Sequence, residues 1–442
     1  MQSNKNVAKQ LFSMTWPMLF GILSLMSFQL VDSAFIGQLG VLPLAAQGFT
    51  APIQLIFIGL QVGLGIATTA LISRALGADN PHFAKQLGGL VILLGAAGIF
   101  VFSLLIWFFR GPVLAMLSAP DSVTPIIDDY WIWWLISTWL GAMIYFFYSI
   151  CRSNGNTMLP GIMMIVTSLL NIALDPLFIF VFDMGIVGAA VATILAFGIG
   201  LLVMTPKVLA NHWLSFDFSD LNIGETLGKI GHIMGPAMMS QLLPPVSAVL
   251  ATKLLAGFGT AAVAAWAVGS RFEFFAIVTV LALTMTLPPM VGRLFGAGNV
   301  AEIKQLVRIA VMYVLGFQAL VAALVWWFAA PLAALMSSDA EVIELVTWHL
   351  LWIPISLGPL GVCMIMVSVA NALGRSYRAL WISTLRLFAF FLPGLWLGGQ
   401  IGGLWGIFIG AAIANICAGI AAWQVYQRIL KATCNTSVPA AS

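Results

Sequence analysis

Residues 86–109 read QLGGLVILLGAAGIFVFSLLIWFF, an apolar run with no charged side chain. A helix of that length rises about 36 Å, which is enough to cross the ~30 Å hydrocarbon core of a bilayer. Similar apolar runs recur along the whole chain of 442 residues. The run therefore indicates a membrane-spanning helix, and its recurrence indicates a polytopic membrane protein with almost no domain outside the bilayer.

The composition supports the same interpretation. Hydrophobic residues make up 61% of the chain, whereas Asp, Glu, Lys and Arg together make up 7%. A soluble domain carries about 25% charged residues, so a water-facing surface could not be built from this sequence. These values exclude a cytosolic enzyme, a nucleic-acid-binding protein and a secreted disulfide scaffold. We expect no catalytic activity and no nucleic-acid partner.

Charged residues, glycines and prolines divide the apolar sequence into twelve expected helical spans. They cover residues 11–37, 45–73, 86–109, 125–150, 157–182, 186–206, 230–257, 261–291, 303–328, 341–370, 377–397 and 402–427. A polar stretch separates the sixth span from the seventh. We therefore expect an N-terminal six-helix lobe at 1–206, a cytoplasmic linker at 207–229, and a C-terminal six-helix lobe with a short cytoplasmic tail at 230–442.

The basic residues predict the orientation of these spans, because cytoplasmic loops carry an excess of Lys and Arg. With the N-terminus inside, 14 of the 18 basic residues fall in cytoplasmic segments, and two, Arg110 and Lys253, fall at or near the outside. The remaining two, Arg271 and Arg386, lie within spans. We expect both termini in the cytoplasm, which also supports an even number of spans.

The chain contains an internal repeat with a register of 219 residues, and this register holds without a gap for about 140 positions. The matching pairs include Pro17 and Pro236, Arg74 and Arg293, Asn80 and Asn299, Pro112 and Pro331, Trp133 and Trp352, and Gly155 and Gly374. Each repeat holds six spans, so both lobes insert in the same orientation. We expect a pseudo-two-fold axis along the membrane normal, an arrangement typical of alternating-access transporters.

Acidic residues inside a membrane span cost about 2.5–3.5 kcal/mol each on insertion scales, and they therefore point to function. Of the 15 acids, three lie well within predicted spans: Asp32, Asp175 and Glu273. Asp32, Asp175 and Thr193 lie at a similar depth, roughly 8–11 Å below the outer surface. Asn171 precedes Asp175 by four residues, so it lies on the same helix face one turn deeper.

Two carboxylates, an amide and a hydroxyl at matching depth form a candidate site for a proton or a small cation. Oxygen ligands suit hard ions such as Na⁺, and desolvation beside a second carboxylate makes a bound proton favourable. The alternative is that each acid merely ends a helix, since Pro176 follows Asp175. In the register of the repeat, Asp32 corresponds to Ala251 and Asp175 corresponds to Gly394. The acids thus belong to the N-terminal lobe alone, which favours a functional interpretation.

Other residues within the spans have more than one interpretation. Pro17 predicts a kink near the inner end of the first span, where the helix either bends during transport or holds a static bend. Arg271 and Glu273 lie two residues apart on different helix faces, and structural ion pairs with neighbouring helices would also explain them. His349 is expected to be a hydrogen-bonded core histidine. Arg386 has no acidic partner that the sequence identifies.

Several segments resemble the multidrug and toxic compound extrusion (MATE) family. They are Val31-Asp32-Ser33-Ala34-Phe35-Ile36-Gly37, Arg74-Ala75-Leu76-Gly77, Asn171-Ile172-Ala173-Leu174-Asp175-Pro176, Gly185-Ile186-Val187-Gly188, Arg271-Phe272-Glu273 and Val291-Gly292-Arg293. The resemblance covers essentially the whole chain. An acid in the first span, with Asn, Asp and Thr on the fifth and sixth, is similar to the DinF-like prokaryotic branch. The acids that other branches carry on the seventh and tenth spans are not matched, so a C-terminal cation site is not implied.

The resemblance implies two six-helix lobes that export amphiphilic drugs and dyes, often cationic, in exchange for H⁺ or Na⁺. It implies that Asp32, Asn171, Asp175 and Thr193 form the ion- and proton-coupling site, with Na⁺ as the one candidate metal ion, and that Pro17 is a bending hinge. It also implies a multi-pass protein of a bacterial-type inner (plasma) membrane. We expect a monomer among membrane lipids, with no cofactor besides the coupling ion.

Two alternatives stay open. A lipid-linked saccharide flippase of the same superfamily would share the scaffold, but its cavity should be basic to hold pyrophosphate, and such proteins commonly have extra helices. A channel or a non-transporting membrane scaffold would explain the helices but not acids in one half of a parallel repeat. The sequence has no phosphate loop of the form GxxxxGK[ST], so we expect no direct use of ATP.

Overall fold

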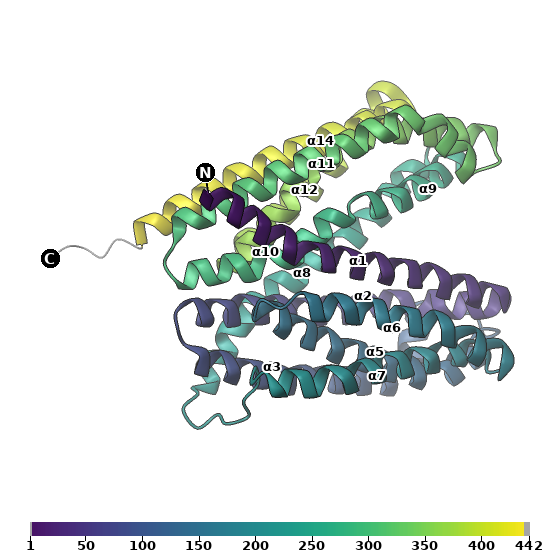
Figure 1. The fold of residues 1–442 in the computed structure, drawn as a ribbon. Helices are drawn as coiled ribbons and strands as arrows, with labels where there is room; N and C mark the ends of the chain where they lie inside the picture. Colours follow the sequence, from purple (N-terminus) through teal and green to yellow (C-terminus); the bar gives the residue numbers. More distant parts are fainter. Residues whose placement is uncertain (1, 437–442) are drawn as a thin grey trace. The chain divides into compact units, whose positions relative to one another are not determined.

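The computed structural model describes residues 2–436, and within them it contains helices and connecting turns but no β-strand (Figure 1). The chain divides into two compact units. The N-terminal unit comprises Met14–Met238, and the C-terminal unit comprises the chain from Met239 onward together with the chain before Met14. The two units are described separately.

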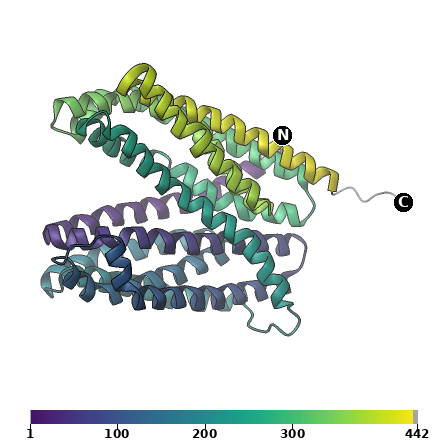
Figure 2. The ribbon, with the colours of Figure 1, turned by 180° about the vertical axis from the view of Figure 1, so that it is seen from behind.

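The N-terminal unit is a bundle of long helices that run side by side (Figures 1 and 2). Its elements are α1 (Gln2–Gln38, of which the part from Met14 belongs here), α2 (Val41–Gly77), α3 (Pro81–Phe108), the short α4 (Arg110–Met116), α5 (Thr124–Ser153), α6 (Met158–Pro176), the π-helical η1 (Leu177–Val181) and α7 (Gly185–Ala210). Each of the six spans predicted for this half coincides with one of the long helices, with η1 continuing α6.

The C-terminal unit repeats this series of helices with two differences. Its elements are α8 (Ile223–Ala256, from Met239), α9 (Thr260–Ala276), α10 (Val278–Gly296), α11 (Val300–Met336), α12 (Ala340–Ala372), α13 (Ser376–Thr384), the π-helical η2 (Leu385–Phe391) and α14 (Leu392–Thr436). The predicted span 261–291 is interrupted at Ile277, between α9 and α10. The predicted spans 377–397 and 402–427 form one helical run with a kink at Gly403, whose φ is 59° and ψ −143°.

The predicted number of spans agrees with these helices. Eleven described segments are long and apolar enough to cross a membrane. The last of them, Ser376–Ala432, has 57 residues and contains the two predicted spans 377–397 and 402–427, with the kink at Gly403 at the start of the second. The predicted fold class, an all-α polytopic membrane protein with twelve transmembrane helices, is confirmed.

One helix lies at the centre of each unit. Helix α5 packs against α2, α3, α6 and α7, and α12 packs against α9, α10, α11, α13 and α14. These two are the most buried of the described membrane-length helices. In the N-terminal unit, Trp131 and Phe146 of α5 are fully buried in one core with Phe57 of α2. Helices α5 and α12 occupy the same place in the repeat, so the fourth span of each half organises its bundle.

The predicted linker at 207–229 is partly helical. Helix α7 extends to Ala210 and α8 begins at Ile223, so the non-helical part is confined to 211–222. This connection packs on α3, where the Gln86 side-chain nitrogen donates to the Asp217 carbonyl oxygen at 2.9 Å. A Cβ atom at Gly89 of α3 would overlap the same connection. The connection therefore belongs to the packed N-terminal unit.

Glycines hold the two arms of α14 together around the kink at Gly403. A Cβ atom on Gly398 would overlap the carbonyl oxygen of Gly406, and one on Gly406 would overlap that of Gly398. A second close approach of the same kind joins Gly394 and Gly410. Small residues let helix backbones approach closely where lipid provides no hydrophobic driving force for association. The predicted eleventh and twelfth spans thus form a tight helical hairpin.

We predict that Gly398→Ala destabilises the protein, because the added methyl group must separate the two arms. Overpacking of this kind costs about 1–3 kcal/mol. The apparent Tm of the purified protein in detergent should fall accordingly. Gly316→Ala on α11 is the matched control, since a Cβ there meets no atom within 4 Å. An equal Tm for both variants would contradict the close packing of α14.

Candidate ion-coupling site

Three of the four residues predicted for ion coupling form a hydrogen-bonded group on α6 and α7. Asn171 and Asp175 are 1% and 0% exposed, and Thr193 is half-buried. The Asn171 side chain reaches the Thr193 hydroxyl at 2.9 Å. Its other side faces both carboxylate oxygens of Asp175, at 2.8 and 3.0 Å. The predicted four-residue spacing thus places an amide between an acid and a hydroxyl in the core of the bundle.

The Asn171 amide can satisfy this group in two ways. With its nitrogen toward Asp175, it donates to both carboxylate oxygens and accepts a hydrogen bond from Thr193. With its nitrogen toward Thr193, it donates to the hydroxyl, which in turn donates to the Ala189 carbonyl oxygen at 2.9 Å. The amide oxygen then faces Asp175, an arrangement that is favourable when the carboxyl carries a proton and donates it. Each of the two amide orientations therefore suits one protonation state of Asp175: nitrogen toward Asp175 suits the carboxylate, and oxygen toward Asp175 suits the protonated acid.

The predicted alternative, in which Asp175 only ends a helix, does not fit the local geometry. Helix α6 does not stop at Asp175 but continues through Pro176 into η1, which ends at Val181. Proline has no N–H to donate to the preceding turn, and the wider π-helical turn follows it directly. Local π-helix is frequent at functional sites. The position of Asp175 thus combines full burial, a polar partner and an irregular helix.

The fourth predicted residue, Asp32 on α1, is half-buried and lies in the same unit. The Gln47 side-chain nitrogen of α2 donates to an Asp32 carboxylate oxygen at 3.3 Å. Asp32 also interacts electrostatically with Asp175 and with Tyr130 of α5. The structure therefore brings the two acids within electrostatic range, while their hydrogen bonds go to different partners.

Sequence reasoning missed Gln47 and Tyr130 as neighbours of the site. Gln47 is one of three glutamines in the predicted apolar span 45–73, with Gln54 and Gln61, so its polarity makes it a candidate but does not single it out. Tyr130 is 6% exposed and lies close to the predicted outer end of its span, where a tyrosine is common for interfacial reasons. No sequence signal separates it from other interfacial aromatic residues.

Helix α1 carries Pro17 about 22 Å from Asp32 along the helix axis. A Cβ atom at Gly161 of α6 would lie 2.5 Å from the Pro17 carbonyl oxygen, and one at Gly21 would lie 3.1 Å from the Gly161 carbonyl oxygen. Glycines therefore allow α1 to contact α6 closely at the proline. Because Asp32 lies about 22 Å from Pro17, each ~10° of bend at Pro17 would displace Asp32 by about 4 Å.

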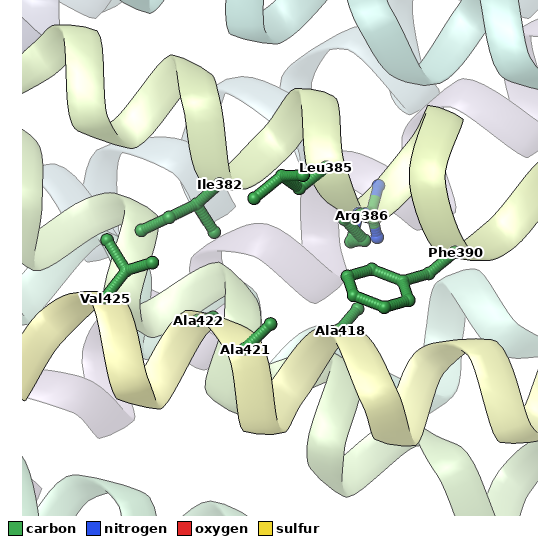
Figure 3. Close-up of a pocket in the computed structure, with 8 residues that line it drawn as sticks. All are labelled: Ile382, Leu385, Arg386, Phe390, Ala418, Ala421, Ala422 and Val425. Atoms are coloured by element: carbon green, nitrogen blue, oxygen red, sulfur yellow. The ribbon is translucent and has the colours of Figure 1, made fainter.

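The charged residues predicted in the C-terminal spans have separate surroundings. Glu273 of α9 contacts His349 of α12, with 2.7 Å between the carboxylate oxygen and the ring nitrogen Nε2. This pair matches the interpretation of Glu273 as an ion-pair partner and of His349 as a hydrogen-bonded core residue. Arg271 is exposed, and no acid among the described residues pairs with it. Arg386 on η2 lies among apolar side chains such as Phe390 and Ala418 (Figure 3).

The MatE family model matches the chain twice, at residues 17–177 and 236–396. The second match starts and ends at the positions that the internal repeat assigns to the start and end of the first, which confirms the register of the repeat. Together the matches cover well over half of the 442 residues. The chain belongs to the MatE family of membrane transporters.

Relatives of known structure and curated relatives agree with this assignment. The Vibrio cholerae MATE transporter VcmN in its bent form is 63% identical, with a TM-score of 0.97, over 99% of this chain and 100% of that one. A FAD transporter of Shewanella oneidensis is 32% identical over 96% of this chain and 95% of that protein. The multidrug export protein MepA of Staphylococcus aureus is 25% identical over 98% and 96%. The chain is thus a polytopic membrane transporter with drug-exporting relatives.

We predict that Thr193→Val lowers stability, because Asn171 loses a partner while the shape of the side chain is kept. The expected loss is about 1 kcal/mol, the usual cost of a buried hydrogen bond, seen as a lower apparent Tm. Thr205→Val is the control, since the Thr205 hydroxyl on the same helix bonds only its own helix, at the Leu201 carbonyl oxygen 2.8 Å away. Equal Tm values for the two variants would remove Thr193 from the network.

Proposed function

We propose that this transporter is an antiporter that exports amphiphilic, often cationic, organic compounds in exchange for H⁺ by alternating access, with Asp32, Asn171, Asp175 and Thr193 as the coupling site. The main support is the buried contact between Asn171 and Asp175, which has a satisfied arrangement with and without a proton on the acid. Na⁺ is the alternative coupling ion, because the same oxygen groups can bind it.

The two carboxylates, Asp32 and Asp175, would account for the proposed exchange of ion and substrate. When both Asp32 and Asp175 are ionised, their like charges repel in a medium with little water. A proton or a cationic substrate relieves this repulsion, so each competes with the other for the same negative charge. Competition of this kind produces antiport. The site binds the substrate well only after the proton has dissociated, and it binds the proton well only after the substrate has dissociated. A proton taken up outside would thus favour release of the substrate there.

The proton gradient provides enough free energy for this export. One pH unit is equivalent to about 1.4 kcal/mol per proton, and about 100 mV of membrane potential adds about 2.3 kcal/mol per charge moved. An exchange that moves one net charge inward can use both terms and supports a substrate gradient of several hundred-fold. Exchange of one proton for one monovalent cation moves no net charge, so it uses the pH gradient alone and supports about tenfold per pH unit. The basic residues predict that both termini face the cytoplasm of a bacterial-type inner membrane, so we propose uptake of protons from outside and no use of ATP.

A hinge at Pro17 would connect occupancy of the site to movement of α1. We propose that protonation of the site changes the partners of Asp32 and that α1 bends at Pro17 in response. The glycine contact between Gly161 and Pro17 anchors the inner part of α1, so a bend moves mainly the part that carries Asp32. The similar V. cholerae transporter VcmN is known in a bent form, which supports a change of bend as part of the proposed cycle.

A second candidate function is the export of FAD, which the 32% identity to the S. oneidensis FAD transporter supports. FAD is an anionic dinucleotide, so it would be repelled by ionised acids and attracted by Arg271 or Arg386 in the C-terminal spans. A cationic dye therefore needs negatively charged groups at its binding site, whereas FAD needs positively charged groups. Transport assays with each compound can distinguish the two functions.

We predict that Asp32→Asn abolishes efflux driven by a pH gradient, because the substituted side chain can no longer gain or lose a proton. The assay is efflux of a cationic dye from proteoliposomes, with pH and Na⁺ gradients imposed separately and FAD loaded in parallel vesicles. Asp128→Asn is the control, since Asp128 is paired with Arg110 at 3.2 Å and is 40% exposed.

Dye efflux by the wild type under a pH gradient alone, lost in Asp32→Asn, would support H⁺ antiport. Dye efflux that needs Na⁺ would keep the site and change the ion. Equal efflux by both proteins would remove Asp32 from the mechanism. Efflux of FAD in place of dye would favour the second candidate function.

We predict that Pro17→Ala impairs transport more than binding. The substitution restores a backbone N–H and removes the clash with the preceding turn that favours a bend, while the groups of the coupling site stay in place. Dye affinity of the detergent-solubilised protein should stay within about threefold of the wild type, and efflux should fall by roughly tenfold, an increase of about 1.4 kcal/mol in the barrier. Pro52→Ala in α2 is the control. Full efflux by Pro17→Ala would show that the bend is static.

A further inference from the structure

Glu273 and His349 form a second pair of titratable groups in the spans, and the coupling site of the N-terminal unit does not include it. His349 is 0% exposed, whereas the Glu273 side chain is 22% exposed. Ring nitrogen Nε2 lies 2.7 Å from one carboxylate oxygen. The other ring nitrogen, Nδ1, is buried and has no hydrogen-bond partner among the described residues.

The surroundings of the imidazole fix its position. Trp266 and Phe408 lie parallel to each other, and both meet the ring edge to face at 5.4 Å between centroids. A Cβ atom at Gly269 would overlap the imidazole ring, so only glycine leaves room for it there. The ring is therefore held against Glu273 by packing.

Helix α9 ends one turn after Glu273, and a buried side chain supports this break. The carbonyl oxygen of Ala276, left free where α9 ends, accepts a hydrogen bond from the Gln318 side chain of α11 at 3.0 Å. Gln318 is 1% exposed. Interruption of a helix beside a charged group within the membrane is typical of ion sites in transporters. The pair thus lies where the backbone is already irregular.

In the internal repeat, Glu273 and His349 correspond to positions of the N-terminal unit that lie near Asp32. In the register of the repeat, Trp266 corresponds to Gln47, Glu273 to Gln54 and His349 to Tyr130. Gln47 donates a hydrogen bond to Asp32, and Tyr130 interacts with it electrostatically. One place in the repeated scaffold therefore holds an acid in both units, on the first span in one and on the eighth in the other.

We propose that Glu273 and His349 form a second proton-binding site, located in the C-terminal unit, which contributes to the coupling of transport. The coupling part rests on the proposed proton antiport. Glu273 takes up the proton, because its side chain is 22% exposed, whereas that of His349 is 0% exposed. His349 is a positioning residue, since a proton on Nδ1 would leave a buried donor without an acceptor.

Other charged groups of this unit leave the pair isolated. On α9, Arg271 is exposed and lies on a different face from Glu273. On η2, Arg386 interacts with Cys363, which is about 21 Å along α12 from His349. Glu341 and Glu344 are exposed at the start of α12. The facing parts of α11 (316–336) and α14 (401–412) carry no titratable side chain. Among the described residues, the one ion pair of Glu273 is with His349, so protonation of Glu273 removes the charge that His349 faces.

Infrared difference spectroscopy between acidic and neutral pH tests proton binding directly. The purified Asp32→Asn, Asp175→Asn double variant serves as background, since it lacks the acids of the other site. We expect a carboxylic acid C=O band that is lost in Glu273→Gln and unchanged in Glu344→Gln. Gly269→Ala keeps both groups but displaces the imidazole, so it should move the midpoint of the band without abolishing it. A band that survives Glu273→Gln unchanged would overturn the proposal.

Proteoliposome efflux tests the coupling role. With Asp32 and Asp175 intact, Glu273→Gln should reduce pH-driven dye efflux by roughly fivefold or more, and Glu344→Gln should not. If Glu273→Gln loses the infrared band but keeps full efflux, the coupling role is overturned, and Glu273 is a proton-binding site that does not contribute to coupling. Absence of pH-driven efflux in the wild type would contradict the proposed antiport, whereas the infrared band would still decide whether Glu273 binds a proton.

Discussion

A charge or an unpaired polar group is far more costly in hydrocarbon than in water, and this constraint accounts for most of the structure. Backbone groups must be satisfied within each segment, so the spans are helices. Side-chain groups must find partners among neighbouring helices. Asp175 has Asn171, Glu273 has His349, and Asp32 has Gln47. In each case the acid lies beside an uncharged or titratable partner rather than a fixed cation, so a proton remains the means of removing its charge.

The internal repeat explains how one scaffold holds different chemistry in its two halves. The fourth span lies at the centre of both units, as α5 and as α12. The polar residues around it differ, because Tyr130 of α5 corresponds to His349 of α12 and Gln54 corresponds to Glu273. Helix packing depends on apolar and small residues that both halves share. Polar positions were thus free to diverge while the bundle was kept.

The sequence predicted those features that depend on length, hydropathy or spacing within one helix. Twelve spans and the contact between Asn171 and Asp175, four residues apart, belong to this class. It did not predict features that depend on contacts between helices. Examples are the proximity of Glu273 to His349, which are 76 residues apart, and the partnership of Gln47 with Asp32. The break at Ile277 was also missed, because no proline or glycine marks it and a side chain of α11 supports it.

The sign of the buried charge limits what such a site can exchange. A carboxylate that a proton neutralises attracts an organic cation when the proton leaves, so one group serves both partners of the exchange. An anionic dinucleotide would instead need a cation that remains charged, because arginine does not lose its proton in proteins. The acids Asp32 and Asp175 belong to the N-terminal unit, whereas Arg271 and Arg386 belong to the C-terminal unit. In the proposed exchange, a cationic substrate would therefore depend on the acids of the N-terminal unit, and an anionic one would need a fixed cation instead.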